Sequence, residues 1–405
     1  MLKTKRLFGL LVGSLLIAAP CHGQVTAPRD PAQIQFGPVS VYPSLQIVDA
    51  GRDENVFNDA AAPVTDYTLT VSSRVLAALH LGANELLFQT GNDYVWFQEF
   101  ESERSSNAIY AVRFNLSASR FKPFIGADHI RSRARRSPEI DARARRVDRS
   151  VQGGLAFELT PRTAITAAAR LDDARFDEGE LFRGVDLGDA LNRSGRGGDL
   201  GVRYAVTPLT TITVSAGYEE QTFEQSHIRD AKKYMIGPAL DFNPEAAIRG
   251  RVVAAIERFT PDDPSLAERT GLAYQAVLGW SLFGRTAFDL GAGRNISYSY
   301  RDTEPYYLLT NAQLTVGHPL FAGLEVYGGV NWDHMSYRWK RIAAGPLGES
   351  DSVVTVKGAN GGVGFDLGHG FKAKVGVEKL RRRSADDPIQ NYDRTRFLTT
   401  VTVGS

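Results

Sequence analysis

The sequence predicts an all-β protein, a transmembrane antiparallel up-and-down β-barrel of about 18 strands, and three observations predict it. Apolar and polar residues alternate along most of the chain. Short and long connections alternate between the resulting segments, and beyond the first residues no apolar run is long enough for a membrane helix. The composition, with 43% hydrophobic residues, 23% charged residues and a net charge of +1, is that of a folded chain. Sixteen strands is the alternative count, because strand boundaries shift by a few residues in such a prediction.

The N-terminus has the pattern of a secretory signal peptide. Lys3 and Arg6 lie near the start of the chain, and the apolar run Leu7–Ala19 that follows them is too short to cross a membrane as a helix. Cleavage after Gly23 would also remove Cys21, the single cysteine, so the exported chain relies on no disulfide. The predicted organisation is a signal peptide at 1–23, a periplasmic N-terminal segment at 24–38 and an outer-membrane β-barrel at 39–405.

Period-two alternation is clear between Ala108 and Leu116. The even positions there are apolar, whereas the odd positions include Arg113 and Asn115, which predicts a strand with one apolar and one mostly polar face. The same even register recurs in Leu200–Val206, Ile212–Tyr218, Tyr234–Phe242, Leu272–Leu282 and Leu324–Trp332. An odd register holds in Tyr67–Leu81, Val151–Leu159, Phe371–Val377 and Phe397–Val403. We expect the apolar face of each strand to meet lipid and the opposite face to line the lumen.

The connections between strands alternate strictly between short and long. The expected short turns are Gly82–Asn84, Ala118–Arg120, Thr160–Arg162, Thr207–Leu209, Asn243–Glu245, Gly284–Arg285, His318–Leu320 and Gly368–Gly370. The expected long loops are 50–66, 98–107, 128–147, 172–199, 219–232, 258–270, 295–305, 333–352 and 378–394. Transmembrane barrels have this layout, with tight periplasmic turns, long extracellular loops and, for an even strand number, both termini in the periplasm. A soluble sandwich with Greek-key crossings has no reason to show it.

Aromatic residues lie near several expected strand ends. They are Tyr94, Trp96, Trp280, Tyr337 and Trp339. Such positions suit the aromatic girdle of a membrane barrel, and ordinary core packing explains some of them as well.

One stretch resembles a known family. Phe36–Leu45 reads FGPVSVYPSL and Arg52–Asp59 reads RDENVFND. Together they resemble the first strand of the "Putative beta-barrel porin 2" family, which has a P-S-L strand followed by D-x-N-V-F. The resemblance covers about 25 residues. It implies a Gram-negative outer-membrane barrel, often linked with exopolysaccharide export, and it supplies no catalytic residues. The chain departs from such barrels at its end, because Phe397–Ser405 has no terminal aromatic residue.

No catalytic residue, metal ligand or cofactor site is predicted, and we expect the protein not to be an enzyme. The histidines are scattered singly, and neither metal-ligand spacing nor a nucleotide-binding glycine pattern occurs. His334 and Ser336 would point to the same face of a strand, but no third, orienting group accompanies them. Asp172, Asp173 and Asp177 lie in one loop without EF-hand spacing, so a solvated acidic loop is favoured over calcium binding.

Arginine gives the chain its unusual local chemistry. Between Asp128 and Ser150 there are eight arginines against four acidic residues, around the expected turn Ser137–Glu139. Three interpretations stay open: a solvated hairpin, a site for lipopolysaccharide phosphates, or a basic lumen mouth that draws in acidic sugars. Nucleic acid is not an expected partner, because an exported barrel has little access to it.

The positions of eight basic residues in the alternating strand pattern predict that their side chains face the lumen. Phe124 and Ile130 occupy even positions that we assign to lipid, so the odd-numbered arginines of the hairpin should point to the lumen mouth. Other basic residues lie opposite the apolar faces of their strands. The candidate lumen or rim residues are Arg74, Arg113, Arg131, Arg133, Arg135, Arg203, Lys357 and Lys374.

The predicted function is a water-filled passage in the outer membrane for export or diffusion of anionic (exo)polysaccharide or small anions. Eighteen strands enclose a lumen wide enough for water. The first rival is a non-conducting structural or docking barrel of a secretion complex, and an outer-membrane hydrolase is the third hypothesis. The expected partners are outer-membrane lipid and lipopolysaccharide, together with polysaccharide or secretion-system components.

Overall fold

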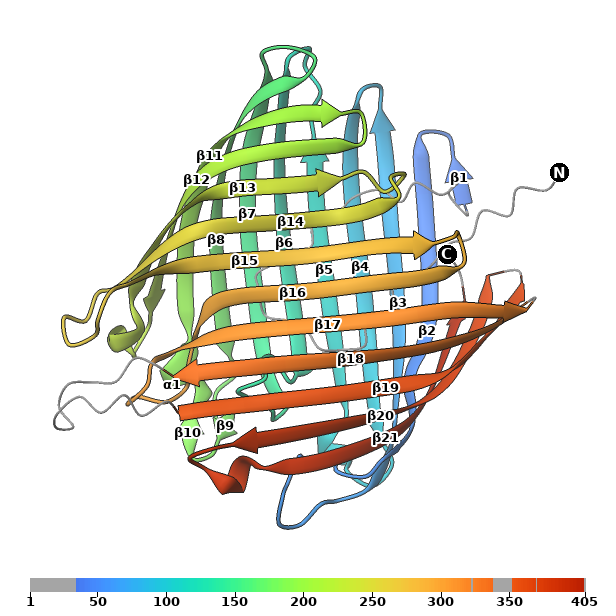
Figure 1. Ribbon diagram of the computed structural model, residues 1–405, viewed down its shortest axis with the longest axis vertical. Helices are drawn as coiled ribbons and strands as arrows, with labels where there is room; N and C mark the ends of the chain where they lie inside the picture. The colour runs from blue at the N-terminus through green and yellow to red at the C-terminus, as the bar shows by residue number, and fades with distance from the viewer. Residues whose placement is uncertain (1–33, 322, 338–351, 369, 404–405) are drawn as a thin grey trace.

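A computed structural model describes residues 34–321, 323–337, 352–368 and 370–403. The described chain forms one antiparallel sheet of 19 strands, in which the short β1 (Ile34–Phe36) pairs with β2 and the other eighteen close into a barrel. Figure 1 shows the closed wall from the side, with the early strands behind the later ones. The predicted antiparallel barrel and its count of about eighteen strands are confirmed.

The wall strands run in chain order around the barrel. The first seven are β2 (Val39–Asp53), β3 (Asp66–Leu81), β4 (Asn84–Phe97), β5 (Ser105–Asn115), β6 (Phe121–Ala134), β7 (Ala144–Glu158) and β8 (Thr163–Phe176). The next six are β11 (Arg193–Thr207), β12 (Thr210–Phe223), β13 (Ala231–Phe242), β14 (Ile248–Pro261), β15 (Arg269–Leu282) and β16 (Thr286–Tyr298). The last five are β17 (Tyr306–Phe321), β18 (Leu324–Tyr337), β19 (Ser352–Gly368), β20 (Phe371–Ser384) and β21 (Tyr392–Val403).

The barrel closes where β2 meets β21. Leu45 pairs with Val403 at one end of this seam and Asp53 pairs with Arg396 at the other. The register of β2 shifts near Asp49, which has a φ of 54°. A β-bulge of this kind inserts a residue and bends the strand, so the seam closes with its hydrogen-bond ladder continued on both sides.

Within the described residues, helical structure is confined to the loops. The short elements there are β9 (Leu181–Phe182), β10 (Val185–Asp186), α1 (Leu187–Leu191), η1 (Glu101–Glu103), η2 (His227–Arg229) and η4 (Pro388–Gln390). Asp186 caps α1, because its side chain accepts hydrogen bonds from the backbone of Gly188 and Asp189. No helix in the described part of the chain is long and apolar enough to cross a membrane.

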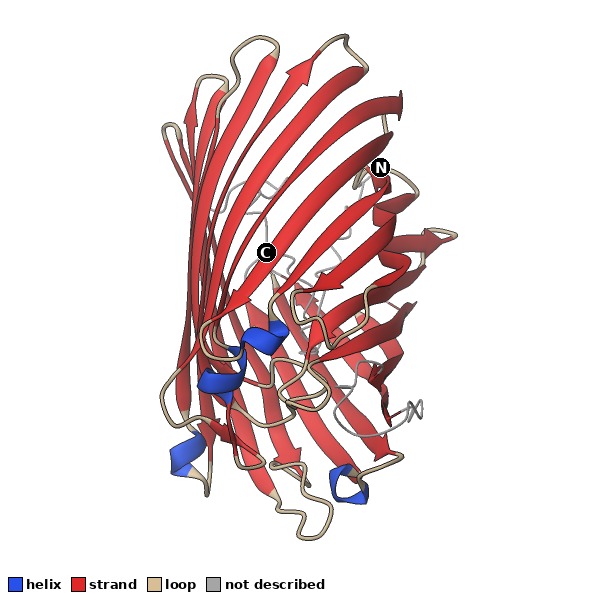
Figure 2. Ribbon diagram, turned by 90° about the vertical axis from the view of Figure 1, so that its left-hand side faces the viewer, coloured by secondary structure: helices blue, strands red, loops and turns tan. Residues whose placement is uncertain are grey.

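The two ends of the barrel differ in their connections. One end, called the turn end here, carries the eight short turns, and the other, the loop end, carries the longer loops and the short helices (Figure 2). Ile34 and Val403, the first and last described residues, both lie at the turn end. The predicted alternation of short and long connections is therefore confirmed for the described residues. The loop 338–351 lies outside them.

Two boundary predictions were wrong. The turn expected at His318–Leu320 comes later, because Pro319 still pairs with Glu325 and Gly323, with a φ of 81°, lies in the actual turn. The strands also extend further into the expected loops. The loop between β6 and β7, for example, spans 135–143 rather than 128–147. Charged residues such as Arg131 continue the strand pairing, so polarity alone overestimates the loop.

The outer face is an apolar surface made of cross-strand ladders. One ladder runs through Phe88, Val112, Ala127, Val151 and Leu171. A second runs through Leu200, Ala216, Ile236, Ile256 and Leu272. Leu171 is 60% exposed and Leu200 66% exposed, which is unusual for leucine in a folded protein unless another apolar phase covers it. These ladders are the lipid-facing band of a membrane barrel.

The aromatic girdle prediction holds only in part. Tyr94 and Trp96 lie on the outer face near the loop end of β4, and Trp280 stacks on Phe288 near the turn end with ring centroids 5.0 Å apart. Tyr337 was wrongly assigned, because it is fully buried inside the loop end rather than exposed to lipid. Trp339 lies outside the described residues.

Candidate functional site: the inner wall and the loop-end plug

Contacts across the barrel identify its inner face. Glu139, in the loop between β6 and β7, accepts hydrogen bonds from Ser299, which follows β16, and from Tyr337 at the end of β18. Several strands separate β6 from β16 and from β18 in both directions around the wall. Such contacts pass through the interior, so Tyr337 and the residues on its face of the sheet point inward.

Ion pairs cover the inner wall along its height. Arg74 Nη2 lies 2.7 Å from Asp93 Oδ1 on the neighbouring strand. Lys374 Nζ lies 2.8 Å from Glu325 Oε1, two strands away. A side chain that faced lipid could not carry such charge without a large cost, whereas the lumen of a porin tolerates it. The inner wall is therefore polar, and much of its positive charge is balanced by carboxylates.

Two inner guanidinium groups near the turn end have no carboxylate partner among the described residues. Arg113 donates from Nε to Asn115 Oδ1 at 2.8 Å and lies over the ring of Phe124, 4.0 Å from its centroid. Arg203 shares its face with Ala164 and Thr213, its neighbours on the adjacent strands. Both arginines lie towards the turn end of their strands, so they leave positive charge on that part of the lumen wall.

The loop 135–143 folds into the lumen instead of extending away from the barrel. Asn58 donates to the carbonyl oxygen of Asp141 at 3.2 Å, which fixes the loop to the segment after β2. Arg382, on the inner face of β20, donates to the carbonyl oxygens of Pro138 and Glu139. The loop thus spans from β6 to the opposite wall. We call the buried assembly that it forms with its neighbours the loop-end plug.

Glu139 is the central polar residue of the plug and is only 1% exposed. Its Oε1 accepts from Ser299 Oγ at 2.7 Å and from Tyr337 Oη at 2.9 Å, while Oε2 has no hydrogen-bond partner in the described part of the chain. Burial raises the pKa of Glu139, although these hydrogen bonds and the nearby charges of Arg301 and Arg382 oppose the shift. The unpartnered oxygen is consistent with a carboxyl group that holds its proton more tightly than usual.

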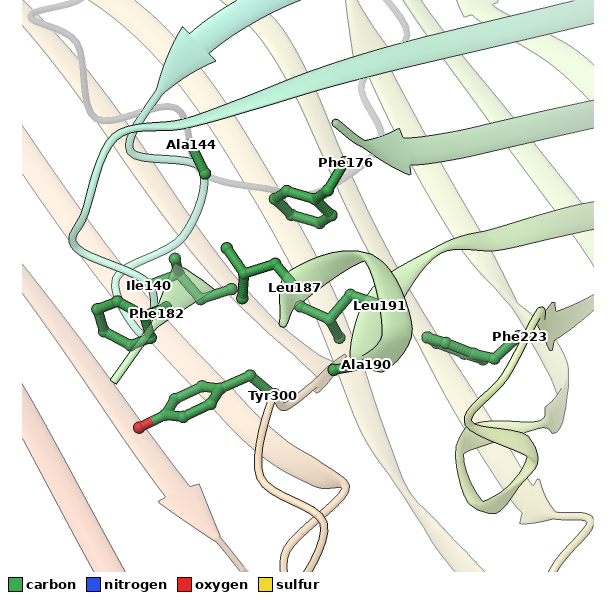
Figure 3. Close-up of a cluster of buried hydrophobic side chains, with 9 residues drawn as sticks. All are labelled: Ile140, Ala144, Phe176, Phe182, Leu187, Ala190, Leu191, Phe223 and Tyr300. Carbon is green, nitrogen blue, oxygen red and sulfur yellow. The ribbon is translucent and has the colours of Figure 1, made fainter. Parts of the chain in front are cut away.

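An apolar cluster fills the plug beside Glu139 (Figure 3). Leu187 and Leu191 of α1 are buried between the loop 135–143 and the barrel wall. The other buried members are Ile140, Ala144, Phe176, Phe182, Ala190, Phe223 and Tyr300. They come from three loops and from the ends of β7, β8 and β12, so burying their apolar surface holds the loops together inside the lumen.

The tip of the β16–β17 hairpin adds a second layer to the plug. β15 and β16 pair only as far as Tyr274 and Arg294, and beyond this point β16 pairs with β17 alone. Tyr306 at this tip packs edge-to-face on Phe259 of β14, with ring centroids 4.8 Å apart. Its hydroxyl donates to backbone carbonyls at the η2 turn. The tip therefore covers the inner wall formed by β12 to β14.

The structure places five of the eight predicted lumen residues inside the barrel and three on its outer face. Arg74, Arg113, Arg203 and Lys374 lie on the inner wall, and Arg135 is partly buried in the plug, where it donates to the carbonyl oxygens of Val56 and Asp141. The expectation was wrong for Lys357, which pairs with the outward-facing Trp332. The register assumed for β19 was one residue off, and such a slip moves every side chain to the other face.

The same kind of error affected the arginine hairpin. Phe124 pairs with Asn115 and contacts Arg113, so it faces the lumen and not lipid. Arg131 consequently shares the outer face with the ladder residue Val112, and Arg133 lies on that face beside Arg131, where it forms an ion pair with Glu103. Neither lines the lumen mouth.

Sequence reasoning missed the plug residues Glu139, Arg382 and Leu187. Two signals could have found the plug. Ile140 interrupts a strongly charged loop, and the loop before β11 carries Phe182 and Leu191 with other apolar residues. Apolar residues in a long loop indicate that something covers them. No local pattern marks Glu139 or Arg382, because their partners are far away in the sequence.

The residues considered for catalysis and for calcium binding, His334, Asp172 and Asp173, lie in strands of the barrel wall. His334 lies against Trp332, with ring centroids 5.6 Å apart, and its Nδ1 is 3.4 Å from the hydroxyl of Thr355. The acidic residues 172 and 173 belong to β8 and not to a loop, and each accepts from an arginine two positions away. The contacts of His334, Asp172 and Asp173 are therefore made with neighbouring residues of the wall.

A closed barrel with an apolar outer face and an ion-paired inner wall is an outer-membrane β-barrel of the porin type. The model of the family described as "Putative beta-barrel porin 2" matches residues 27–405, so the chain belongs to this family. The resemblance noted for the first strand is thereby confirmed. No curated protein sequence matches the chain.

Solved structures with a similar fold are bacterial outer-membrane proteins with low sequence identity. OccK2 (OpdF) of Pseudomonas aeruginosa, solved in complex with glucuronate, is 11% identical with a TM-score of 0.49, covering 90% of this chain and 98% of its own. OccK3 (OpdO) of the same organism is 13% identical with a TM-score of 0.47, covering 90% and 96%. The FrpB iron transporter of Neisseria meningitidis is 12% identical with a TM-score of 0.42, covering 85% and 62%.

Proposed function

We propose that the protein is a gated passage in the outer membrane for anionic solutes, including acidic polysaccharide or its fragments. The observation that carries the proposal is the ion-paired inner wall, with pairs such as Arg74–Asp93 and Lys374–Glu325. A wall of this width and polarity holds water, whereas a barrel built only as a scaffold has no need for paired charges inside it. Arg113 and Arg203, which lack carboxylate partners among the described residues, favour anions over cations.

The proposal includes an orientation. Membrane barrels carry short turns on the periplasmic side and long loops on the outside. The turn end, with both described chain ends, is then periplasmic, and the plug closes the passage from the outside. Solute movement requires that the loop 135–143 leave the lumen or shift within it.

Single-channel recording in planar bilayers tests the proposal. The informative variant replaces residues 136–141 by a Gly-Ser linker of equal length, which removes Glu139 and its contacts across the lumen. We expect the wild-type protein to conduct rarely and the variant to conduct at least about tenfold more often, since several buried contacts hold the plug. The control replaces the exposed Ala60, Ala61 and Ala62 by the same type of linker, and its conductance should equal that of the wild type.

The plug also favours a second function, a non-conducting docking barrel for a secretion complex. Its buried apolar cluster makes the loop end a rigid surface, which suits binding of another protein. The same recording separates the two functions. If the linker variant folds and still shows no conductance, the passage is wrong and the docking barrel is favoured.

A further inference from the structure

The outer face of β6 and β7 carries an arginine patch that the passage does not use. Arg131 of β6 pairs with Val147, and Arg145 and Arg149 lie two positions to either side of Val147 on the same face of β7. At about 3.3 Å of rise per residue, Arg145 and Arg149 lie about 13 Å apart, with Arg131 beside the midpoint between them, so one ligand that carries two anionic groups can span the three arginines. The side chain of Arg131 is 62% exposed, and Arg145 and Arg149 are exposed as well.

This patch has an excess of positive charge. Among the described residues, Arg145 and Arg149 have no carboxylate partner, and Arg131 has only Asp177, at 3.6 Å. Asp173, which lies opposite Arg149, instead accepts from Arg175 at 2.9 Å. The surrounding carboxylates therefore leave the three arginines without full compensation.

Several other cations on the outer face near the loop end are paired with acids. The pairs are Arg196–Glu220 at 2.6 Å, Lys232–Asp262 at 2.9 Å and Arg258–Glu268 at 2.7 Å. A solvated charged rim would have this balanced form everywhere. The arginine patch on β6 and β7 departs from this balanced form, which indicates an anionic ligand from outside the chain.

The position of the patch selects the kind of ligand. Arg149 is followed on its face by Val151, which is 49% exposed, and Val151 pairs with Leu171, which is 60% exposed. Tyr110 lies beside His129 on the same face, at the level of Arg149. The arginines therefore lie at the border of the lipid-facing band, where phosphate head groups meet acyl chains.

We propose that the arginine patch Arg131, Arg145 and Arg149 binds the phosphates of the outer-leaflet glycolipid, lipid A, while its acyl chains lie on Val151 and Leu171. Guanidinium groups bind phosphate with paired N–H donors, which makes arginine suited to this contact. The apolar surface next to the patch favours a lipid over a soluble polyanion. The proposal rests on the orientation with the loop end outside, and it is independent of whether the lumen conducts.

Native mass spectrometry of the full chain in non-ionic detergent, with bis-phosphorylated lipid A as the probe, tests the proposal. The variant R131Q/R145Q/R149Q should bind lipid A at least about tenfold more weakly than the wild type, because each arginine near a charged lipid surface strengthens binding several-fold. The control K232Q/R196Q/R258Q removes the same number of positive charges from the same face. Its affinity should stay within about twofold of the wild type, since these cations already have acidic partners.

Three results would overturn the proposal. Equal losses in variant and control would mean that net charge alone attracts the lipid. Equal binding of dephosphorylated lipid A would mean that acyl chains alone carry the contact. Displacement of lipid A by millimolar inorganic phosphate would assign the patch to a free anion. A change of gel mobility on boiling, which reports a closed barrel, verifies that each variant is folded, and the single substitution R149Q provides the same comparison if the triple variant does not fold.

Discussion

Val112 in the barrel wall and Glu139 in the plug are both defined by their neighbours, but these lie at very different distances along the chain. Val112 pairs with Phe88 and Ala127 on the two adjacent strands. Glu139 is bonded to residues 160 and 198 positions away. The wall therefore follows from a local rule, the alternation of side chains along a strand. The plug depends on contacts that exist only after the barrel has closed.

This difference predicts that the two regions fail in different ways. A change in the lipid-facing wall should prevent assembly, whereas a change in the plug should leave an assembled barrel with altered opening. The following predictions test this comparison, beginning with the largest expected effect.

Substituting Val112 by Arg should impair insertion into the membrane. An arginine facing lipid near the bilayer midplane costs roughly 2–4 kcal/mol in a membrane barrel. Leu278, which lies on the outer face of β15, should respond in the same way. The fraction of heat-modifiable, folded protein after refolding into lipid vesicles measures the effect. The control Asn115→Arg places the same charge on the inner wall near Glu85, and it should insert almost normally. Equal damage at both positions would show that the inner and outer faces are assigned wrongly.

Substituting Glu139 by Ala should release the plug without harming the wall. The hydroxyl groups of Ser299 and Tyr337 would lose their acceptor inside a buried cluster, which costs about 1–3 kcal/mol. Hydrogen exchange of residues 135–143 should become roughly tenfold faster or more, while exchange in β3 to β5 stays unchanged. Faster exchange throughout the barrel would contradict the separation of wall and plug.

The raised pKa of Glu139 predicts that the plug loosens as the pH rises. Below the ordinary glutamate pKa of about 4.3 the carboxyl group is protonated in both the packed and the released loop, so packing has no penalty from charge. Because the packed state holds the proton more tightly, its stability falls as the pH rises from this value through the raised pKa. The charged and titratable side chains that face Glu139 are those of Arg229, Arg301, Arg382, Tyr307 and Tyr337.

Bilayer recordings over this pH range should therefore show more frequent opening as the pH increases. Glu139→Gln keeps an oxygen acceptor for Ser299 and Tyr337 but cannot titrate, so its opening should be nearly independent of pH. A variant with the same pH dependence as the wild type would assign the effect to another group.

The sequence was sufficient for most of the wall and insufficient for the plug, and particular residues show why. The even register of Leu200–Val206 places its apolar residues on the outer face, as the pairing with Ala216 and Val214 confirms. In β6, by contrast, Phe124 is an inward aromatic and Arg131 an outward charge, so the apolar-out rule gave the wrong parity. Charged residues are common on the outer face beyond the lipid band, where alternation carries no information about direction. Glu139 could not be found, because burial by distant loops leaves no periodic trace.

The smallest expected effect concerns the ions that pass the turn end once the plug is open. Arg113 and Arg203 are on the inner wall there without carboxylate partners among the described residues, whereas Lys374 is neutralised by Glu325. In the linker variant of residues 136–141, the double change R113Q/R203Q should lower the preference for chloride over potassium by roughly two- to threefold, and only at low salt, since screening acts over about 10 Å at 0.1 M. The control K374Q/E325Q removes a balanced pair and should leave the preference unchanged. The reversal potential in a salt gradient measures both. An equal shift in both variants would mean that lumen polarity in general, and not unpaired positive charge at the turn end, sets the selectivity.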